Sequence, residues 1–213
     1  MNIFKVDLKG LSEHTKVIKA NTLFGAFCTA VNGDSKMMDE VTFSDFIHQK
    51  NTGSDIVSQK VYIDCSFRGN NKVWSKKVSW EGGYFLAATT LSKDKFTDVL
   101  KKMLELGIGA DRSSGNGQFE LLGITDVTSE CTSKKGTKCY TLSDSLPDSN
   151  VAFVSNFEFT CYDSISMNGV VKPLMYMVKS GAKLVGDSFG IIGSNRCSNG
   201  VWTQGKSIIL PCE

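Results

Sequence analysis

The chain has 213 residues, of which 41% are hydrophobic and 22% are charged, and its formal net charge is +2. This composition predicts a globular protein with a substantial core, organised as one large domain or two small ones. So small a net charge is a weak guide to binding partners. No apolar run is long enough for a membrane span, and the start MNIFKVDLKG lacks the pattern of a signal peptide.

The first half of the chain is expected to alternate strands and helices. Residues 1–9 alternate apolar and polar side chains like a half-buried strand. Asn21 is the expected cap of a helix that runs through TLFGAFCTAVN, and a weaker helical turn is expected over residues 43–49. Further strands are predicted at residues 61–67 and 82–90.

The clearest helix follows the last of these strands. Ser92 is its expected cap, Asp94 suits its first turn, and an apolar stripe begins at Phe96. Gly107 supplies the stop, and QFELLGI forms a further strand after a glycine-rich stretch. The resulting β-α-β-β-α-β order predicts an α+β, ferredoxin-like domain over residues 1–127. Because this fold hosts many functions, it names none, and the aromatic signature of the RNA-recognition module is absent.

The remainder of the chain is expected to form a smaller second half. Residues 128–149 are a polar crossing segment with weak internal order. Residues 150–213 contain the strand patterns VAFVSNFEF, KPLMYMVKSGAKL and KSIILPCE. They are too few for a complete second copy of the first domain. We therefore expect a partial, β-rich C-terminal subdomain packed on the first.

The seven cysteines indicate a reducing compartment. Their number is odd, and most lie among apolar residues, which argues against the disulfide framework of a secreted protein. The chain has no CxxC motif, and the spacing of Cys131 and Cys139 does not suit zinc. Asp34, Asp39 and Glu40 are expected in a solvated loop. The sequence thus predicts a cytoplasmic protein without a metal or other cofactor.

The glycine-rich stretch GIGADRSSGNGQFE, residues 107–120, is the strongest candidate for chemistry. Glycines allow positive φ and close backbone approach, and successive N–H groups can hold phosphate oxygens. Arg112 adds a guanidinium fork, and Ser113 and Ser114 add hydroxyl donors. The stretch is no P-loop, because GxxxxGK[ST] is missing and the stretch follows a helix. A long turn is the alternative, but connections of about two to six residues suffice there.

These residues resemble a known family. GIGADRSSGNGQFEL fits the form GxGxx[KR]S[ST]GxG found in the RAMP superfamily of CRISPR proteins. NTLFGAFCTAV is similar to the first-helix motif of one branch, and KPLMYMVKSGAKL and GKSIILPCE are similar to its C-terminal strands. That branch is the Cas five-like subunit four family of type III-A (Csm) interference complexes. Residues 34–56 offer little sequence for the inserted base-displacing hairpin of such proteins, and whether the chain carries this hairpin stays open. Because the second half is also small, the chain would fit as a compact or divergent member of the branch.

The resemblance implies a non-catalytic protein that grips the 5′ tag of a CRISPR RNA. It also implies contacts with the large polymerase-like subunit and with the first backbone RAMP subunit of the filament. The loop residues expected to bind RNA are Gly107, Gly109, Asp111, Arg112, Ser113, Ser114, Gly115, Asn116 and Gly117. The expected contacts elsewhere are Asn21, Thr22 and Gly25 at the first helix, with Arg68, Lys76 and Lys77 as further backbone contacts.

Two other functions stay open at this point. A related branch, the CRISPR-RNA processing endonucleases, uses a histidine near the first helix to cleave RNA without metal, and His14 has that position. Those enzymes, however, carry the glycine loop close to the C-terminus, whereas about ninety residues follow it here. The third possibility is a scaffold subunit that does not contact RNA directly.

Overall fold

The computed structural model describes residues 1–12, 14–15, 18–48, 77–78, 83–109, 112, 115–147, 149, 151–155, 158–162 and 174–212. The helices of the first half are α1 (Ala20–Ala30), α2 (Ser35–Asp39) and α3 (Lys93–Leu106). Its strands are β1 (Asn2–Gly10), β2 (His14–Thr15), β3 (Val41–Phe43), β4 (Ile47–His48), β5 (Lys77–Val78), β6 (Gly83–Thr89) and β7 (Phe119–Asp126).

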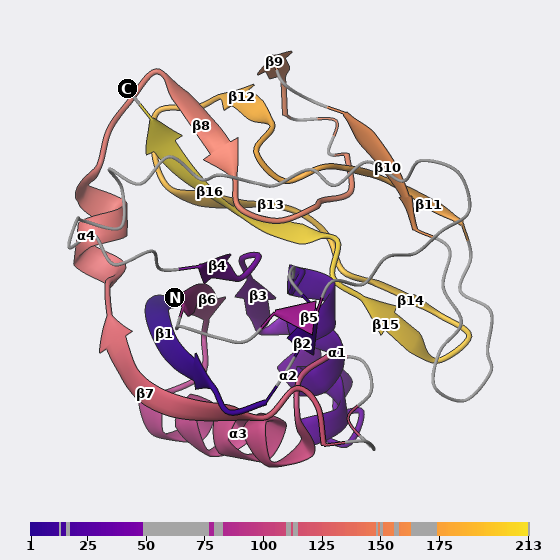
Figure 1. Ribbon diagram of the computed structural model, residues 1–213. Coiled ribbons are helices and arrows are strands. Elements are labelled where there is room, and N and C mark those ends of the chain that lie inside the picture. Colours follow the sequence, from indigo (N-terminus) through magenta and orange to yellow (C-terminus); the bar gives the residue numbers. More distant parts are fainter. Residues whose placement is uncertain are drawn as a thin grey trace.

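The first half has the ferredoxin-like topology. Its sheet has the order β3-β6-β1-β7 with antiparallel pairing throughout, and β4 also pairs with β6. Helices α1 and α3 lie on one face of this sheet (Figure 1). Phe4 stacks on Phe96 with ring centroids 5.5 Å apart, so β1 and α3 share one core. The predicted α+β class is therefore confirmed.

Both long helices were located correctly from their apolar periodicity, but one cap was not. Helix α3 begins after Ser92, whose hydroxyl accepts the Lys95 N–H at 3.3 Å, and it ends at Gly107 as expected. The expected cap of α1 at Asn21 is wrong. The N-cap residue is Lys19, which forms no side-chain cap bond, and Asp45 Oδ1 accepts the Ala20 N–H at 2.8 Å instead.

The region after α1 differs from the sequence expectation. The helical turn expected over residues 43–49 is wrong, because β3 and β4 occupy that part of the chain. All three residues of β3 are buried, so the strand shows no alternation that a sequence could reveal. Residues 34–40 are not a plain loop: Asp34 accepts the N–H groups of Lys36 and Met37 and caps α2. The strand predicted at 61–67 lies outside the described residues.

The second half is rich in strands. Its elements are α4 (Thr128–Ser133), β8 (Lys138–Thr141), β9 (Phe153–Ser155), β10 (Phe159–Tyr162), β11 (Met175–Val178), β12 (Lys183–Val185), β13 (Gly190–Gly193), β14 (Arg196–Ser198), β15 (Val201–Thr203) and β16 (Lys206–Cys212). The order β13-β16-β8-β12-β9 forms a second five-stranded sheet, and β10–β11 and β14–β15 form separate hairpins. The weak order expected for 128–149 is wrong, since α4 and the central strand β8 lie there. In β8, buried Cys139 and Thr141 alternate with less buried neighbours.

The second sheet packs on the face of the first sheet that the helices leave open (Figure 1). Ile3 and Leu86 of the first sheet share a buried cluster with Leu142, Ile208 and Leu210. The division proposed between residues 1–127 and 150–213 therefore runs across a shared core. This face of the sheet is the one on which RNA-recognition modules stack bases, and in this chain it is buried.

A buried amide also joins the two halves. Gln204 is fully buried, and its side chain accepts the Phe43 N–H at 3.0 Å and donates to the Phe43 carbonyl at 2.7 Å. The amide thus satisfies the free edge of β3 as a neighbouring strand would. Among the described residues, no helix is both long and apolar enough to cross a membrane.

Candidate nucleic-acid interface

The connection between α3 and β7 is built on glycines with positive φ. Gly107 has φ 78°, Gly109 has 103°, Gly115 has 81° and Gly117 has 72°. Side chains with a Cβ rarely adopt this region, so each position favours glycine. The sequence predicted that these glycines allow positive φ, and all four of them adopt it.

Backbone contacts draw the two ends of the connection together. The Ile108 N–H donates to the Gly117 carbonyl at 2.8 Å, and a Cβ on Gly117 would overlap the Ile108 carbonyl oxygen. Ile108 is fully buried and anchors this end of the loop in the core. Next to it, the Leu11 N–H donates to the Gln118 carbonyl at 2.9 Å. The two ends of the connection are therefore held together at Ile108 and Gly117, the base of the loop.

Arg112 lies over that base. Its Nη1 donates to the Gly107 carbonyl at 3.5 Å, and its own carbonyl accepts the Gly115 N–H at 3.0 Å. The guanidinium is half-buried and stands beside the last turn of α3, where the helix dipole favours a cation. A phosphate at this loop would have no helix N-terminus to help it. Binding there would depend on Arg112 and on backbone N–H groups.

The structure describes part of the predicted loop site. Gly107, Gly109, Arg112, Gly115, Asn116 and Gly117 lie together in the loop. Asp111, Ser113 and Ser114 lie outside the described residues, as do Arg68 and Lys76. Lys77 is in β5, where its backbone pairs with Thr15. That pairing lies a few residues along the chain from Ser12, whose hydroxyl accepts the Gln118 N–H at the loop base.

The predicted residues at the start of α1 have partners within the protein. Asn21 Oδ1 accepts the Gln204 N–H at 2.8 Å, which ties α1 to the second half. The Thr22 N–H donates to the Lys19 carbonyl at 2.8 Å. Gly25 is exposed, with open space around its Cα. Because Asp45 already places a carboxylate at this helix end, the end does not suit a phosphate.

Sequence reasoning missed a buried ionic cluster beside this helix end. Lys19 Nζ lies 2.8 Å from Asp45 Oδ2 and 3.5 Å from Asp144 Oδ1. Ser180 donates its hydroxyl to Asp45 at 2.8 Å and its backbone N–H to Asp144 at 2.7 Å. The four residues come from distant parts of the chain and from both halves. No local sequence signal could have grouped them.

Burial and charge act against each other in this cluster. Burial raises the pKa of the Asp45 carboxyl, although the nearby Lys19 ammonium opposes the shift. Burial acts to lower the pKa of Lys19, but the two carboxylates outweigh it and the pKa is raised. Lys19 therefore stays charged and cannot act as a base for Ser180 near neutral pH. We assign the cluster to joining the two halves rather than to catalysis.

The close contact between Gly117 and the Ile108 carbonyl gives a stability prediction. Gly117→Ala is expected to lower the free energy of unfolding by at least about 2 kcal/mol, because the methyl group meets the Ile108 carbonyl in a strained backbone region. Gly115→Ala is the matched control. It has a similar φ but open space, so a loss of about 1 kcal/mol is expected. Urea unfolding of both variants measures the difference, and equal losses would contradict the close contact.

The fold is an antiparallel ferredoxin-like sheet backed by two helices, with a glycine-rich connection before the last strand of that sheet. No protein-family model matches the sequence, and no curated protein matches it. Solved structures provide the comparison instead.

The similar structures are Csm4 chains from type III-A complexes. The Csm3–Csm4 subcomplex of the type III-A CRISPR–Cas interference complex matches with a TM-score of 0.58 and 13% identity, over 100% of both chains. The Csm1–Csm4 cassette in complex with pppApApA matches with 0.58 and 14%, over 100% of this chain and 98% of that one. The same cassette with one ATP gives 0.57 and 13%. The family resemblance is thereby confirmed as a likeness in fold, and it extends through the second half.

Proposed function

We propose that this chain is a non-catalytic RNA-binding subunit of a type III CRISPR interference complex. It would grip the 5′ tag of a CRISPR RNA and dock both a large polymerase-like subunit and a backbone RAMP subunit. The observation that carries the proposal is the full-length match in fold to Csm4, together with the positive-φ glycines of the connection before β7. In the similar structures, Csm4 is assembled with Csm3 or with Csm1.

The loop is the proposed grip. Its N–H groups over residues 109–117 would face the phosphates, with Arg112 as the fork and Ser113 and Ser114 as hydroxyl donors. A loop held at its base by Ile108 and Gly117 loses little freedom on binding, which favours affinity. Arg68, Lys76 and Lys77 are proposed as further phosphate contacts. Because such contacts release counterions, affinity should fall as salt rises.

The start of α1 is proposed as a partner surface rather than an RNA site. Asn21 and Thr22 are engaged within the protein, and the adjacent Asp45 repels phosphate. Gly25 is exposed on the next turn, and its lack of a side chain lets another backbone approach closely. A protein neighbour therefore suits this helix end better than RNA does.

The function is tested by the RNA that the assembled complex carries. The complex is purified with this chain in place, and the 5′ ends of its RNA are sequenced. A uniform 5′ tag protected from nuclease is expected, whereas a complex without RNA would leave a scaffold role. In a second arm, the purified chain is incubated with repeat RNA in EDTA. Cleavage that disappears in His14→Ala would overturn the non-catalytic assignment in favour of a processing enzyme.

A further inference from the structure

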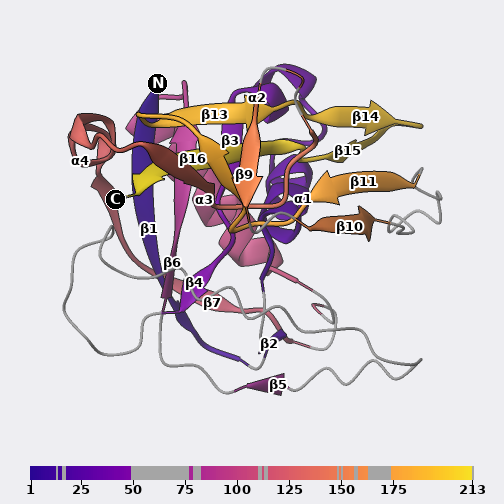
Figure 2. The same ribbon diagram turned by 90° about the horizontal axis from the view of Figure 1, so that it is seen from above.

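Two short hairpins of the second half lie side by side without being paired to each other. Figure 2 shows β15 next to β11, and residues of β11, β14 and β15 line one pocket. Each hairpin is a separate two-stranded sheet. Two-stranded sheets are marginally stable alone, and their outer edges carry backbone groups that can pair with another strand.

At its base, the gap between the hairpins is one strand wide. Ser145 pairs there with Val178 of β11, and their backbones exchange hydrogen bonds of 2.9 and 2.8 Å. On the other side, the Leu146 N–H donates to the carbonyl of Gly205, just beyond β15, at 2.9 Å. Residues 145–146 therefore bridge the two hairpins as a strand would. The next residue, Pro147, has no N–H with which to continue the ladder.

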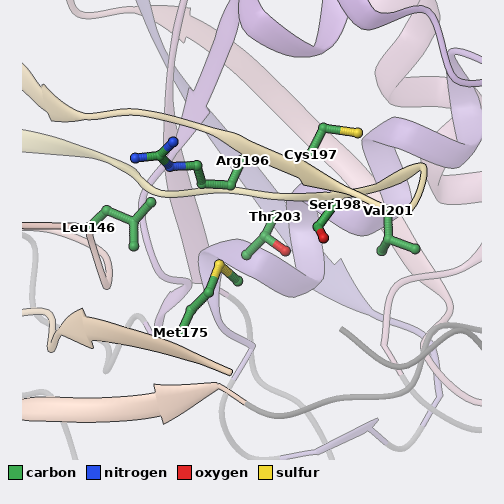
Figure 3. Close-up of a pocket in the computed structure, with 7 residues that line it drawn as sticks. All are labelled: Leu146, Met175, Arg196, Cys197, Ser198, Val201 and Thr203. Atoms are coloured by element: carbon green, nitrogen blue, oxygen red, sulfur yellow. The ribbon is translucent and has the colours of Figure 1, made fainter. Parts of the chain in front are cut away.

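A pocket of about 210 Å³ begins where this bridging segment ends (Figure 3). Ligand pockets for small molecules usually start near 300 Å³, so this one suits an inserted side chain better. Three of its lining side chains are apolar, and two others carry hydroxyl groups. The lining includes Leu146, Met175, Arg196, Ser198, Val201 and Thr203.

Most of the pocket lining from the β14–β15 hairpin comes from two cross-strand pairs, Arg196–Thr203 and Ser198–Val201. Cys197 also lines the pocket, while its cross-strand partner Trp202 packs against the core of the first half. Arg196 is exposed, and its guanidinium forms no ion pair or hydrogen bond with any other residue of the described part. The pocket thus combines apolar walls with an arginine that has no ionic partner among the described residues.

We propose that the slot between β11 and β15 binds an extended segment of a partner protein. The segment continues the line of residues 145–146 and hydrogen-bonds to the two strand edges. One apolar side chain enters the pocket, and a carboxylate pairs with Arg196. This is strand addition, in which the backbone supplies affinity and a side-chain pocket supplies specificity. RNA fits poorly, because apolar walls with one arginine offer little to a phosphate chain.

This inference rests on the proposed function in one respect: the partner is sought among the proteins of the same assembly. Photo-crosslinking in the purified assembly tests it, with p-benzoylphenylalanine in place of Ser198 in the slot. The matched control places the same group at Val185 of β12, which is 62% exposed and belongs to the five-stranded sheet rather than to either hairpin. We expect position 198 to crosslink to one acidic, partly apolar segment of a partner, and position 185 not to reach that segment.

A charge reversal supplies the second arm. Arg196→Glu is expected to weaken association with the crosslinked partner by at least about tenfold, and a lysine in place of the partner's carboxylate should restore it. Crosslinks from 198 to RNA, to a second copy of this chain or within the chain alone would overturn the inference, as would unchanged association of Arg196→Glu. The RNA content of the same assembly is measured in parallel. If the assembly carries tagged RNA but position 198 gives no crosslink, the proposed function stands and this inference fails. If position 198 crosslinks but the assembly carries no RNA, this inference stands and the proposed function fails.

Discussion

Replacing Lys19 with methionine is expected to lower the free energy of unfolding by about 3–5 kcal/mol. The ammonium is the cation that faces Asp45 and Asp144, whose side chains are 13% and 5% exposed. Methionine keeps much of the aliphatic stem but removes the ammonium that lies 2.8 Å from the buried Asp45 carboxylate and 3.5 Å from that of Asp144. Urea unfolding followed by tryptophan fluorescence measures the loss. Because the cluster spans both halves, the transition should stay cooperative and move as a whole.

Asp45→Asn is the matched control for this prediction. It removes one negative charge, so the cluster changes from one cation and two anions to one of each. The amide oxygen can still accept the Ala20 N–H that caps α1. We expect a loss of about 1–2 kcal/mol, from weaker hydrogen bonds to Lys19 and Ser180. A loss as large as that of Lys19→Met would show that the bonds of the Asp45 carboxylate to Lys19 and Ser180, rather than the unbalanced buried charge, dominate.

The same cluster gives the stability a dependence on alkaline pH. Although burial opposes it, the two carboxylates raise the pKa of Lys19 above its ordinary value of 10.5. The folded state therefore holds this proton more tightly than the unfolded state does. Its contribution is complete below pH 10.5 and is lost as the pH rises through the folded pKa. The wild-type protein should lose stability above pH 10.5 more steeply than Lys19→Met.

The two long helices and strand β1 could be predicted because their patterns are local. The apolar stripe from Phe96 fixes α3, and the alternation over residues 1–9 fixes β1, whatever the rest of the chain does. Short buried strands such as β3 carry no such pattern. Its position depends on partners far along the chain, including the Gln204 amide.

The cap of α1 shows a second limit. Asn21 is a good capping residue, but a carboxylate from a later strand connection, Asp45, occupies the helix end. Asn21 instead binds the Gln204 backbone from the second half. Tertiary contacts thus replaced the local capping preference on which the prediction rested. The Lys19 cluster was beyond sequence reasoning for the same reason.

The candidate loop lies between these two cases. The glycines of the loop predicted a backbone with positive φ, and all four of them have positive φ in the structure. The contact between Ile108 and Gly117 that closes the loop was not foreseeable, because it depends on where α3 ends relative to β7. The hydrogen bond from Arg112 to Gly107 was also unforeseen, and it gives Arg112 a structural contact beside its proposed contact with RNA.

Arg112→Ala is expected to weaken binding of the tag RNA by about 10- to 100-fold. Loss of one charge-assisted hydrogen bond to phosphate is worth about 1.5–3 kcal/mol. The slope of log affinity against log salt should become shallower by about 0.7 for each phosphate that the variant no longer neutralises. The thermal midpoint should move by less than about 2 °C, because the side chain is half-buried and its bond to Gly107 is 3.5 Å long. Fluorescence anisotropy with labelled tag RNA at several salt concentrations measures the affinity and the slope, and a thermal melt measures the midpoint.

Two variants separate the possible roles of Arg112. Arg196→Ala removes the same charge from the second half and should leave RNA affinity unchanged, so a general charge effect would appear in both variants. Arg112→Lys keeps the charge but loses the fork, and we expect it to retain the salt slope while losing part of the affinity. If Arg112→Ala weakens binding without changing the slope, the arginine acts by holding the loop through Gly107 and does not contact a phosphate. Unaltered affinity in Arg112→Ala would remove the loop from the RNA-binding surface.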